Sequence, residues 1–542
     1  MHCTRWRFVN VIRLPLNRVR YSSKLAIDSS NLEFSNRNAD ILESLLKYYP
    51  SMTELGGNDV LRVKEFKERY GNFEETQLNE LHDSITINGR IKRIRFSGKK
   101  MVFIDLVEDS NDIQLILNYN EITDNEHFES KLTFLKRGDY IQSYGVPRLS
   151  RSKMKNLSLR CNKLPVILAP AQMPLPLKLT DVVKAKSNKV ANYQINGVGN
   201  LLIRNSVIKS IRKFLEQRDF VEVETPIMSS KSNGAIAKPF KTSSKDFSEL
   251  LLRVAPELWL KRLIVGGFSR VFEIGKSFRN EGIDGTHNPE FTTLEFYQSY
   301  LSMDGLIEMN EILFKQIIQD LFSNELLESY IPESTHELKK ILEDNKWKFQ
   351  KIEFLPTLSK ELGVDLSSID FENPSKLISV IPHEVRKQHL GDETNLSSSH
   401  ILNKLCGVLI EEKYCKSLLP TLIYHHPAVI SPLAKSNPSD VRTTKRFELF
   451  ISGREYTNAY EEENCPQAQL QKFEQQAQLK EDFNDNETLN SIDHEYINAM
   501  KWGMPPIGGF GLGVDRLCML LTGAKRIEEV LSFGSIDDVN RQ

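Results

Sequence analysis

The feature that most constrains the fold is a pair of alternating stretches within residues 269–300. Phe272 and Ile274 share one face of the first stretch, and Glu295 and Tyr297 share one face of the second. An ordinary antiparallel hairpin with one solvated side is the simplest explanation. A face that combines arginine, carboxylates and aromatic rings, beside a polar loop with two glycines, favours a phosphate-handling site instead.

Two strings in this region resemble motif 2 of the class II aminoacyl-tRNA synthetases: Phe278-Arg279-Asn280-Glu281 and His287-Asn288-Pro289-Glu290-Phe291. The resemblance implies that Arg279 binds the ATP α-phosphate and the amino-acid carboxylate, and that Phe291 stacks on adenine. A planar, permanently charged guanidinium suits two anionic groups. Glu281, His287 and Asn288 are implied to bind ATP as well, the first two with catalytic roles beside Arg279.

A glycine-rich stretch at residues 508–513 resembles motif 3 of the same family. The resemblance implies that Arg516 covers the adenine opposite Phe291, lies near the γ-phosphate and takes part in catalysis. Asp515 is predicted to be the N-cap of the apolar helix that follows.

Residues 201–217 have apolar side chains at helical spacing, and Val221 and Val223 then predict a short strand that Pro226 ends. A core helix would explain this pattern without any further role. The segment also resembles motif 1 of class II synthetases, which implies a homodimer.

Five short alternating stretches occur between residues 85 and 161, separated by turn residues. They predict a small closed β barrel with one basic edge, a common nucleic-acid-binding module. This part resembles the OB-fold anticodon-binding domain of the class IIb synthetases for lysine, aspartate and asparagine. Phe103 is implied to stack on an anticodon base and Gln114 to read one by hydrogen bonds. Asn156 stands where bacterial lysine enzymes carry a base-contacting glutamate.

The resemblance also implies an amino-acid pocket. Its residues would be Gly234, Glu257, Glu295, Tyr297, Asn458, Tyr460 and Glu462. Three carboxylates would repel aspartate and attract a substrate with two ammonium groups, so the charge selects L-lysine within class IIb. In this assignment Glu462 and Tyr297 bind the ε-ammonium and Glu257 binds the α-ammonium.

Glu448 and Glu455 match the family's pair of carboxylates that hold Mg²⁺ against the ATP phosphates. Two carboxylates together with phosphate oxygens suit magnesium. A solvated acidic strand is the alternative. The adjacent His425 and His426 would point to opposite faces of a strand, so we interpret them as structural.

The first 27 residues contain six basic residues and no acid, a pattern typical of a mitochondrial presequence. A basic RNA-binding tail is the alternative. Removal of residues 1–21 would change the formal net charge from −1 to about −6, so nucleic acid would have to meet a local basic patch. The six cysteines form no CxxC pair, and no apolar run is long enough to cross a bilayer.

We therefore predict an α+β protein with an N-terminal OB-fold β barrel and a class II synthetase antiparallel-sheet catalytic domain. The predicted divisions are a presequence at 1–21, a helical segment at 22–80, the OB fold at 81–175, a linker at 176–200 and the catalytic domain at 201–542, with a variable insertion at 325–415. Apolar residues from Val60 to Phe66 mark one predicted helix, and the proline-rich residues 165–176 predict an extended connector.

The predicted function is activation of lysine with ATP and transfer of lysine to tRNA(Lys) in the mitochondrial matrix, with Mg²⁺ as cofactor and no membrane partner. One alternative is a ligase that lysylates a protein, but the anticodon barrel argues against it. The other is a non-catalytic, synthetase-derived tRNA-binding or scaffold protein. Such a protein would be free to lose Arg279, Arg516 and the two magnesium-site glutamates, and all four are present.

Overall fold

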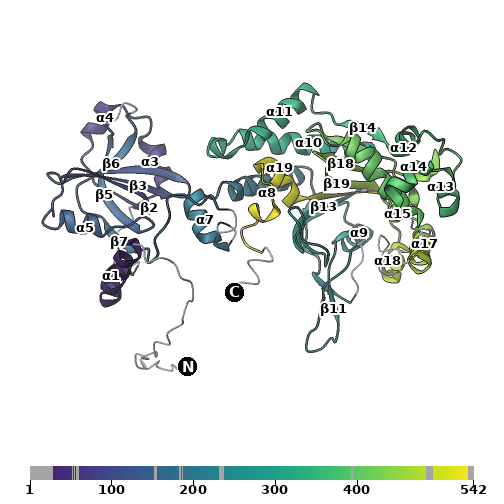
Figure 1. Ribbon diagram of the computed structural model, residues 1–542, viewed down its shortest axis with the longest axis horizontal. Helices are drawn as coiled ribbons and strands as arrows, with labels where there is room; N and C mark the ends of the chain where they lie inside the picture. The colour runs from purple at the N-terminus through teal and green to yellow at the C-terminus, as the bar shows by residue number, and fades with distance from the viewer. Residues whose placement is uncertain are drawn as a thin grey trace. The chain divides into compact units, whose positions relative to one another are not determined.

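The computed structural model describes residues 29–51, 53, 55, 60–151, 155–181, 185, 187–230, 237–391, 396–483 and 492–534. The chain divides into two compact units, Met1–Gly197 and Val198–Gln542 (Figure 1). The predicted presequence at 1–21 lies outside the described residues. None of the helices within the described ranges combines the length and the apolar character that a membrane span requires.

The first unit contains a closed β barrel. Its strands are β2 (Ile85–Ser97), β3 (Met101–Glu108), β4 (Asn111–Asn118), β5 (Tyr140–Leu149) and β6 (Leu157–Cys161). They pair in the order β2-β3-β4-β6-β5, and β5 pairs again with β2 to close the barrel. Ile104, Leu115 and Leu159 alternate into its apolar core. All five predicted strands are confirmed.

Short elements surround the barrel. They are α1 (Ser29–Glu43), α2 (Leu45–Tyr48), β1 (Val60–Leu61), α3 (Val63–Tyr70), α4 (Glu75–Glu80), α5 (Phe128–Phe134), β7 (Val166–Ala169) and α7 (Lys189–Asn196). The predicted helix with Val60, Val63 and Phe66 on its buried side is confirmed as α3 for Val63 and Phe66. It is wrong for Val60, which pairs with Thr86 in a parallel ladder. Part of the predicted extended connector is the strand β7, which pairs with β5.

The second unit is organised around an eight-stranded sheet. Its strands are β8 (Val221–Glu222), β12 (Arg270–Phe278), β13 (Glu290–Ser299), β14 (Gln350–Glu353), β15 (Thr421–Tyr424), β18 (Arg446–Ile451), β19 (Arg454–Glu461) and β20 (Ile507–Gly513). Their order is β14-β15-β18-β19-β20-β13-β12-β8, antiparallel except for the two outermost pairs. The predicted α+β class with a largely antiparallel catalytic sheet is confirmed.

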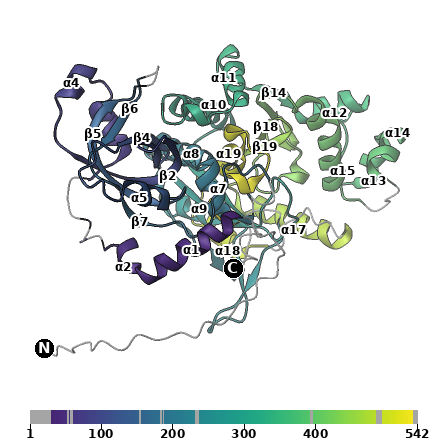
Figure 2. The same ribbon diagram turned by 60° about the vertical axis from the view of Figure 1, so that its left-hand side comes forward.

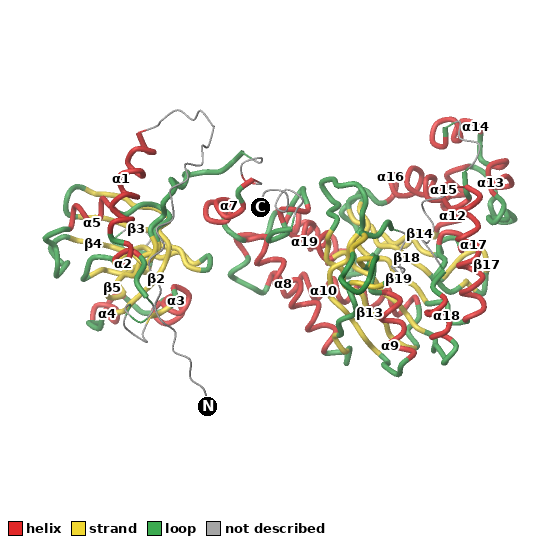
Figure 3. The backbone as a smooth tube through the Cα atoms, turned by 90° about the horizontal axis from the view of Figure 1, so that it is seen from below, coloured by secondary structure: helices red, strands yellow, loops and turns green. Residues whose placement is uncertain are grey.

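Helices cover one face of this sheet. They include α8 (Gly199–Glu216), α10 (Met303–Phe322) and α19 (Val514–Thr522), and Figure 3 shows α8 and α10 side by side. The core lies here, where Phe214 from α8 and Phe314 from α10 belong to the same apolar cluster as Phe296 and Phe510 of the sheet. The other face of the sheet remains available for a cavity.

The remaining elements lie around this sheet. They are α9 (Glu257–Val265), α11 (Glu333–Asp344), α12 (Phe354–Leu362), α13 (Pro374–Val380), α14 (His383–Val385), α15 (Ser398–Leu405), α16 (Glu412–Tyr414), α17 (Pro466–Phe483), α18 (His494–Met500) and the hairpin of β16 (Ser436–Asn437) and β17 (Asp440–Thr444). A small sheet of β9 (Met228–Ser229), β10 (Lys241–Thr242) and β11 (Leu250–Leu252) projects from the unit (Figure 2).

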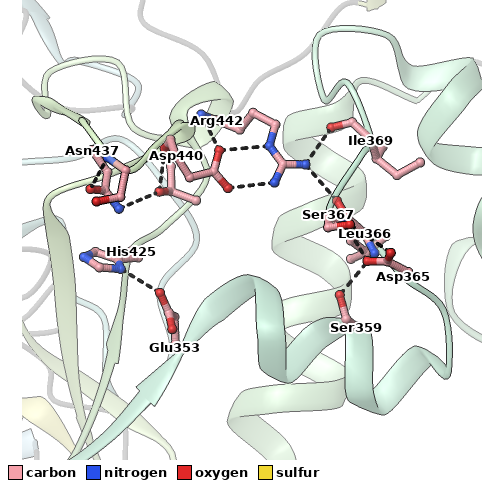
Figure 4. Close-up of polar contacts among 12 residues, drawn as sticks. Glu353, Ser359, Asp365, Leu366, Ser367, Ile369, His425, Asn437, Asp440 and Arg442 are labelled. Carbon is pink, nitrogen blue, oxygen red and sulfur yellow. Dashed lines mark hydrogen bonds and ion pairs between the residues drawn. The ribbon is translucent and has the colours of Figure 1, made fainter.

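The interval 325–415 has its own apolar core, built mainly from α12, α13 and α15. It is also part of the main sheet, because β14 pairs with β15. Arg442 in β17 holds the loop after α12: its guanidinium donates to both carboxylate oxygens of Asp440 and to the carbonyls of Leu366, at 2.8 Å, and Ile369, at 3.2 Å (Figure 4).

The adjacent histidines do not lie on a strand as predicted. β15 ends at Tyr424, and His425 takes a left-handed backbone with φ of 57°. His425 Nδ1 lies 2.8 Å from Glu353 Oε1 (Figure 4), whereas His426 is buried with Nε2 3.3 Å from Glu448 Oε2. The two imidazole rings therefore contact different partners, as predicted. The reason is the turn at His425, and not the alternation of side chains along a strand.

Candidate active site

Strand alternation sorts polar and apolar side chains across the central strands. In β13, Leu294 and Phe296 belong to the core, while Glu295 and Tyr297 line a cavity on the opposite face. The predicted hairpin is confirmed, with Phe278 of β12 opposite Glu290 of β13. The alternation of side chains along the sequence thus assigned Leu294 and Phe296 to the core face and Glu295 and Tyr297 to the cavity face correctly.

The cavity has a volume of about 450 Å³ and lies over β13, β18, β19 and β20. Every described residue that the sequence analysis assigned to ATP, the amino acid or the metal lines it: Glu257, Arg279, Glu281, His287, Asn288, Phe291, Glu295, Tyr297, Glu448, Glu455, Asn458, Tyr460, Glu462 and Arg516. Gly234 lies outside the described residues. Segments up to 260 residues apart in the chain thus converge on one site.

Glycines of β20 keep the cavity open. Gly509 pairs with Tyr297 on one side and with Tyr460 on the other. A Cβ at Gly509 would lie 2.0 Å from Glu462 Oε1 and 2.7 Å from the Tyr297 ring. A side chain at this position would fill the space between the neighbouring strands.

Arg279, directly after β12, extends over the ring of Phe291, with 5.1 Å from the guanidinium carbon to the ring centroid. Its Nε is buried and has no hydrogen-bond partner among the described residues. Burial lowers the pKa of Arg279, whereas Glu281 and Glu455 raise it. A guanidinium with an unused buried donor is suited to bind an anion in the cavity.

His287 connects the loop to the C-terminal helix. Its Nδ1 lies 2.8 Å from Asp284 Oδ2, and its Nε2 accepts from Arg516 Nη2 at 2.8 Å. Hydrogen bonds from Thr286 and His287 hold the pKa of Asp284 well below its usual range, against the opposing effect of burial. The loop therefore holds the imidazole toward Arg516.

Asp515 has a different role from the predicted one. The N-cap of α19 is Gly513, and Asp515 lies inside the first turn. Its carboxylate accepts from the Thr292 backbone N–H at 2.7 Å and from the Arg204 guanidinium. Asp515 thus ties α19 to β13 and α8, next to Arg516.

The other end of the cavity is rich in carboxylates. Tyr460 Oη donates to Glu257 Oε1 at 2.6 Å, and Tyr297 Oη donates to Glu295 Oε2 at 3.0 Å. Burial and the nearby Glu257 raise the pKa of Glu295 to about 8. Burial also raises the pKa of Glu462, and Oε1 of Glu462 is buried without a hydrogen-bond partner among the described residues. This end is suited to a cationic ligand.

Glu448 and Glu455 meet the requirements of a divalent cation. Burial raises the pKa of Glu455 and the charge of Glu448 raises it further, while Arg446 and His426 overcome the effect of burial and lower the pKa of Glu448 to about 2. A cation between the two carboxylates would relieve their repulsion, so their chemistry fits Mg²⁺. Arg446 and His426 were not predicted as neighbours of this pair.

Lys261 is the main feature of the site that the sequence analysis missed. It is fully buried, and its Nζ lies 2.6 Å from Glu257 Oε1 and 2.5 Å from Glu462 Oε2. Glu257 and Lys261 are four residues apart on one helix, and this spacing could have indicated the ion pair between them. The contact with Glu462 joins α9 to the residue directly after β19, and no local sequence pattern indicates it.

The barrel unit presents a separate cluster on its outer face. The guanidinium of Arg95 lies 5.8 Å from the ring of Phe103, and Arg95 and Gln114 both donate to Asp105 at 3.2 Å. Asn156 is exposed, and its backbone pairs with Ser150. An aromatic ring, an amide and a cation on one face form a surface on which bases can stack.

Comparison with known proteins agrees with this geometry. Residues 190–537 match the family described as tRNA synthetases class II (D, K and N), and residues 85–167 match the OB-fold nucleic acid binding domain of the tRNA anticodon type. The mitochondrial lysine–tRNA ligase of Saccharomyces cerevisiae is 54% identical, over 96% of this chain and 95% of that protein. The mitochondrial lysine–tRNA ligase of Schizosaccharomyces pombe is 41% identical, over 83% of this chain and 84% of that protein.

A bacterial lysine–tRNA ligase, from Streptococcus pneumoniae, is 37% identical, over 87% of this chain and 91% of that protein. The matches thus extend through both units, and the family model covers the cavity and its lining residues. The chain belongs to the class II tRNA synthetases of the aspartate, lysine and asparagine group.

Proposed function

We propose that this protein is an enzyme with lysine–tRNA ligase activity. It activates lysine with ATP, releases pyrophosphate and transfers lysine to tRNA(Lys). The observation that carries this proposal is the polarity of the cavity, which has Glu257, Glu295 and Glu462 at one end and Arg279 and Arg516 at the other. The names of the relatives described above support the same activity.

Lysine is held at both ends in this proposal. Glu257 binds the α-ammonium, Glu462 and Tyr297 bind the ε-ammonium, and Arg279 binds the carboxylate. Support comes from two buried atoms that have no hydrogen-bond partner in the described part of the chain: the acceptor Oε1 of Glu462 and the donor Nε of Arg279. Glu295, Asn458, Tyr460 and Gly234 complete the lysine site.

ATP lies over the remainder of the cavity. Its adenine is held between Phe291 and Arg516, and its phosphates meet Arg279 and His287, with Glu281 and Asn288 as further contacts. Glu448 and Glu455 hold Mg²⁺, which neutralises phosphate charge when bound. These side chains act mainly by positioning and by electrostatics.

The first step forms a bond between a lysine carboxylate oxygen and the α-phosphorus of ATP and breaks the bond from that phosphorus to pyrophosphate. Arg279 holds both reacting groups, and Arg516 stabilises charge on the phosphates. In the second step a hydroxyl oxygen of the tRNA terminal adenosine bonds to the lysyl carbonyl carbon, and the bond from that carbon to the phosphate oxygen breaks. AMP leaves with the electron pair, and the hydroxyl proton is released.

The partners follow from the rest of the chain. Phe103 and Gln114 read the anticodon of tRNA(Lys) in this proposal. The protein forms a homodimer through α8, β8 and the segment that follows, where Val221 of β8, Ile227 and Met228 of β9 are exposed apolar residues. The basic first 27 residues and the two relatives named mitochondrial support location in the mitochondrial matrix.

ATP–pyrophosphate exchange with each amino acid in turn tests the activity. Protein lacking residues 1–21 is expected to exchange with lysine alone. Exchange with aspartate or asparagine would contradict the pocket assignment. Absence of exchange with every amino acid would favour a non-catalytic tRNA-binding protein.

A further inference from the structure

A buried lysine of the chain itself pairs with two carboxylates that line one end of the cavity, although it is not part of the lining. Lys261 is 0% exposed, and its Nζ bridges Glu257 Oε1 and Glu462 Oε2 at 2.6 and 2.5 Å. Glu257 and Lys261 belong to α9, whereas Glu462 directly follows β19. One ammonium group thus joins the two carboxylates that are assigned to the two ends of lysine.

Aromatic rings complete the surroundings of this ammonium. Nζ lies 5.9, 5.5 and 5.9 Å from the ring centroids of Tyr297, Tyr460 and Tyr496. Carboxylates together with aromatic faces are the groups that bind an ammonium ion away from water. The ammonium group of Lys261 therefore has the carboxylate and aromatic contacts that a bound ammonium ligand would have.

The charges in this end of the cavity then match the substrate. Among the described residues, Lys261 is the only cation that forms an ion pair with Glu257, Glu295 or Glu462. When bound lysine favours the ionised form of Glu295, three carboxylates and the ammonium of Lys261 leave two negative charges, which equals the number of ammonium groups on free lysine. The lysine carboxylate has its own partner in Arg279.

We propose that Lys261 is a positioning residue that fixes the distance between the two ammonium subsites and thereby selects lysine over shorter diamino acids. This inference rests on the proposed function. Lys261 occupies one oxygen of each carboxylate, so the substrate's ammonium groups meet the remaining oxygens at a set spacing. Ornithine, which is one methylene shorter, cannot reach both.

Protonation gives a second consequence. The ionisable groups that face Lys261 are Glu257 from α9, Glu295 and Tyr297 from β13, Tyr460 and Glu462 at β19, and Tyr496 from α18. Without the ammonium, buried carboxylates would take up protons or turn away, because an unpaired buried charge is strongly unfavourable. Loss of Lys261 should therefore weaken lysine binding most at low pH.

The test compares Lys261→Met with the full-length wild type by lysine- and ornithine-dependent ATP–pyrophosphate exchange. We expect the lysine KM to rise and the preference for lysine over ornithine to fall, each about tenfold or more, with a smaller change in kcat and in the KM for ATP. The lysine KM of the variant should recover as the pH rises from about 7 to about 9, as its carboxylates ionise.

Arg262→Met is the matched control. Arg262 is the next residue of α9 and pairs with Asp493 at 3.1 Å. Its replacement should change the lysine-to-ornithine ratio by less than about twofold, because among the described residues Arg262 forms no ion pair with a carboxylate of the cavity.

A folded Lys261→Met with the wild-type ratio and pH profile would overturn the proposal, as would an equal fall in kcat for both substrates at an unchanged ratio. If Lys261→Met does not fold, Lys261→Gln, whose amide can still donate to a carboxylate, is measured in the same way. Wild-type protein that fails to exchange with lysine would instead contradict the proposed function itself.

Discussion

At the residue scale, the site depends on a few buried charges whose partners are known. Glu462 is 2% exposed, and its Oε2 pairs with Lys261. Glu295 is buried near Glu257, and its carboxylate accepts a hydrogen bond from Tyr297, its one side-chain donor among the described residues. Charges that are buried but incompletely paired have strong effects when they are changed, because little solvent screens them.

Glu462→Gln should lower kcat/KM for lysine by about 100-fold or more. This is the change expected when removal of one partner of a buried ion pair costs about 3 kcal/mol. The KM for ATP should stay near the wild-type value. Glu461→Gln is the control, since the carboxylate of Glu461 accepts from the Met303 backbone N–H and is outside the cavity lining. Equal losses in both variants, measured by pyrophosphate exchange, would contradict the assignment of Glu462.

Lysine binding should release protons near neutral pH. Glu295, with its pKa raised to about 8, is protonated in the empty site, and an ammonium ligand favours its ionised form. Affinity should therefore increase with pH, by at most about tenfold per unit, and level off above about pH 8. Calorimetry in buffers of different ionisation enthalpy counts the protons. Binding that releases none, or that weakens as pH rises, would show that Glu295 is already ionised.

At the scale of elements, β20 is a strand whose glycines shape the cavity. Gly509 lies between Tyr297 and Tyr460 in the ladder, and Gly511 lies between Glu295 and Asn458. The missing side chains leave room for a ligand above the strand. This is the physical reason for a glycine-rich strand in the middle of the sheet, where glycine is otherwise unfavourable.

Gly509→Ala should raise the lysine KM on the order of 100-fold, because the new methyl group displaces Glu462 or Tyr297 by more than a small adjustment. Gly511→Ala should have a much smaller effect on this KM, since its Cβ would meet Asn458 O at an ordinary 3.5 Å. Lysine titrations of both variants distinguish the two positions. Similar KM values would indicate that β20 moves to accommodate the methyl group.

At the scale of the whole molecule, the two units have separate cores. The barrel closes around its own apolar cluster, and the eight-stranded sheet packs against α8, α10 and α19. Chemistry at the cavity should therefore be insensitive to side chains on the outer face of the barrel. Changes there should act only on reactions that include tRNA.

Phe103→Ala should leave pyrophosphate exchange unchanged and raise the KM for tRNA by about 5- to 150-fold. This range corresponds to the loss of about 1–3 kcal/mol of stacking free energy for one base. Phe96→Ala is the control, because Phe96 lies opposite Val102 and thus on the other face of the strand pair from Phe103. Aminoacylation and exchange are measured on the same preparations. Equal tRNA KM values for the two variants would contradict the assigned anticodon face.

The amino-acid sequence by itself determined the local features of this protein. Alternation at period two predicted the five barrel strands and the faces of β13, because side-chain direction in a strand depends only on neighbouring residues. Alternation failed where backbone geometry changes within a few residues, as at His425 with its φ of 57°. The separate prediction that Asp515 is a helix N-cap failed because the partners of its carboxylate are on β13 and α8.

Only the tertiary structure decided how the charges of the cavity are paired. Glu257 and Glu462 are separated by about 200 residues and meet through Lys261 because α9 packs beside the β19-β20-β13 part of the sheet. No local pattern reports such a contact, since burial and charge pairing depend on strand order. The resemblance to the family assigned Glu257 and Glu462 to a lysine site, but only the folded chain shows that the ammonium group of Lys261 lies between them.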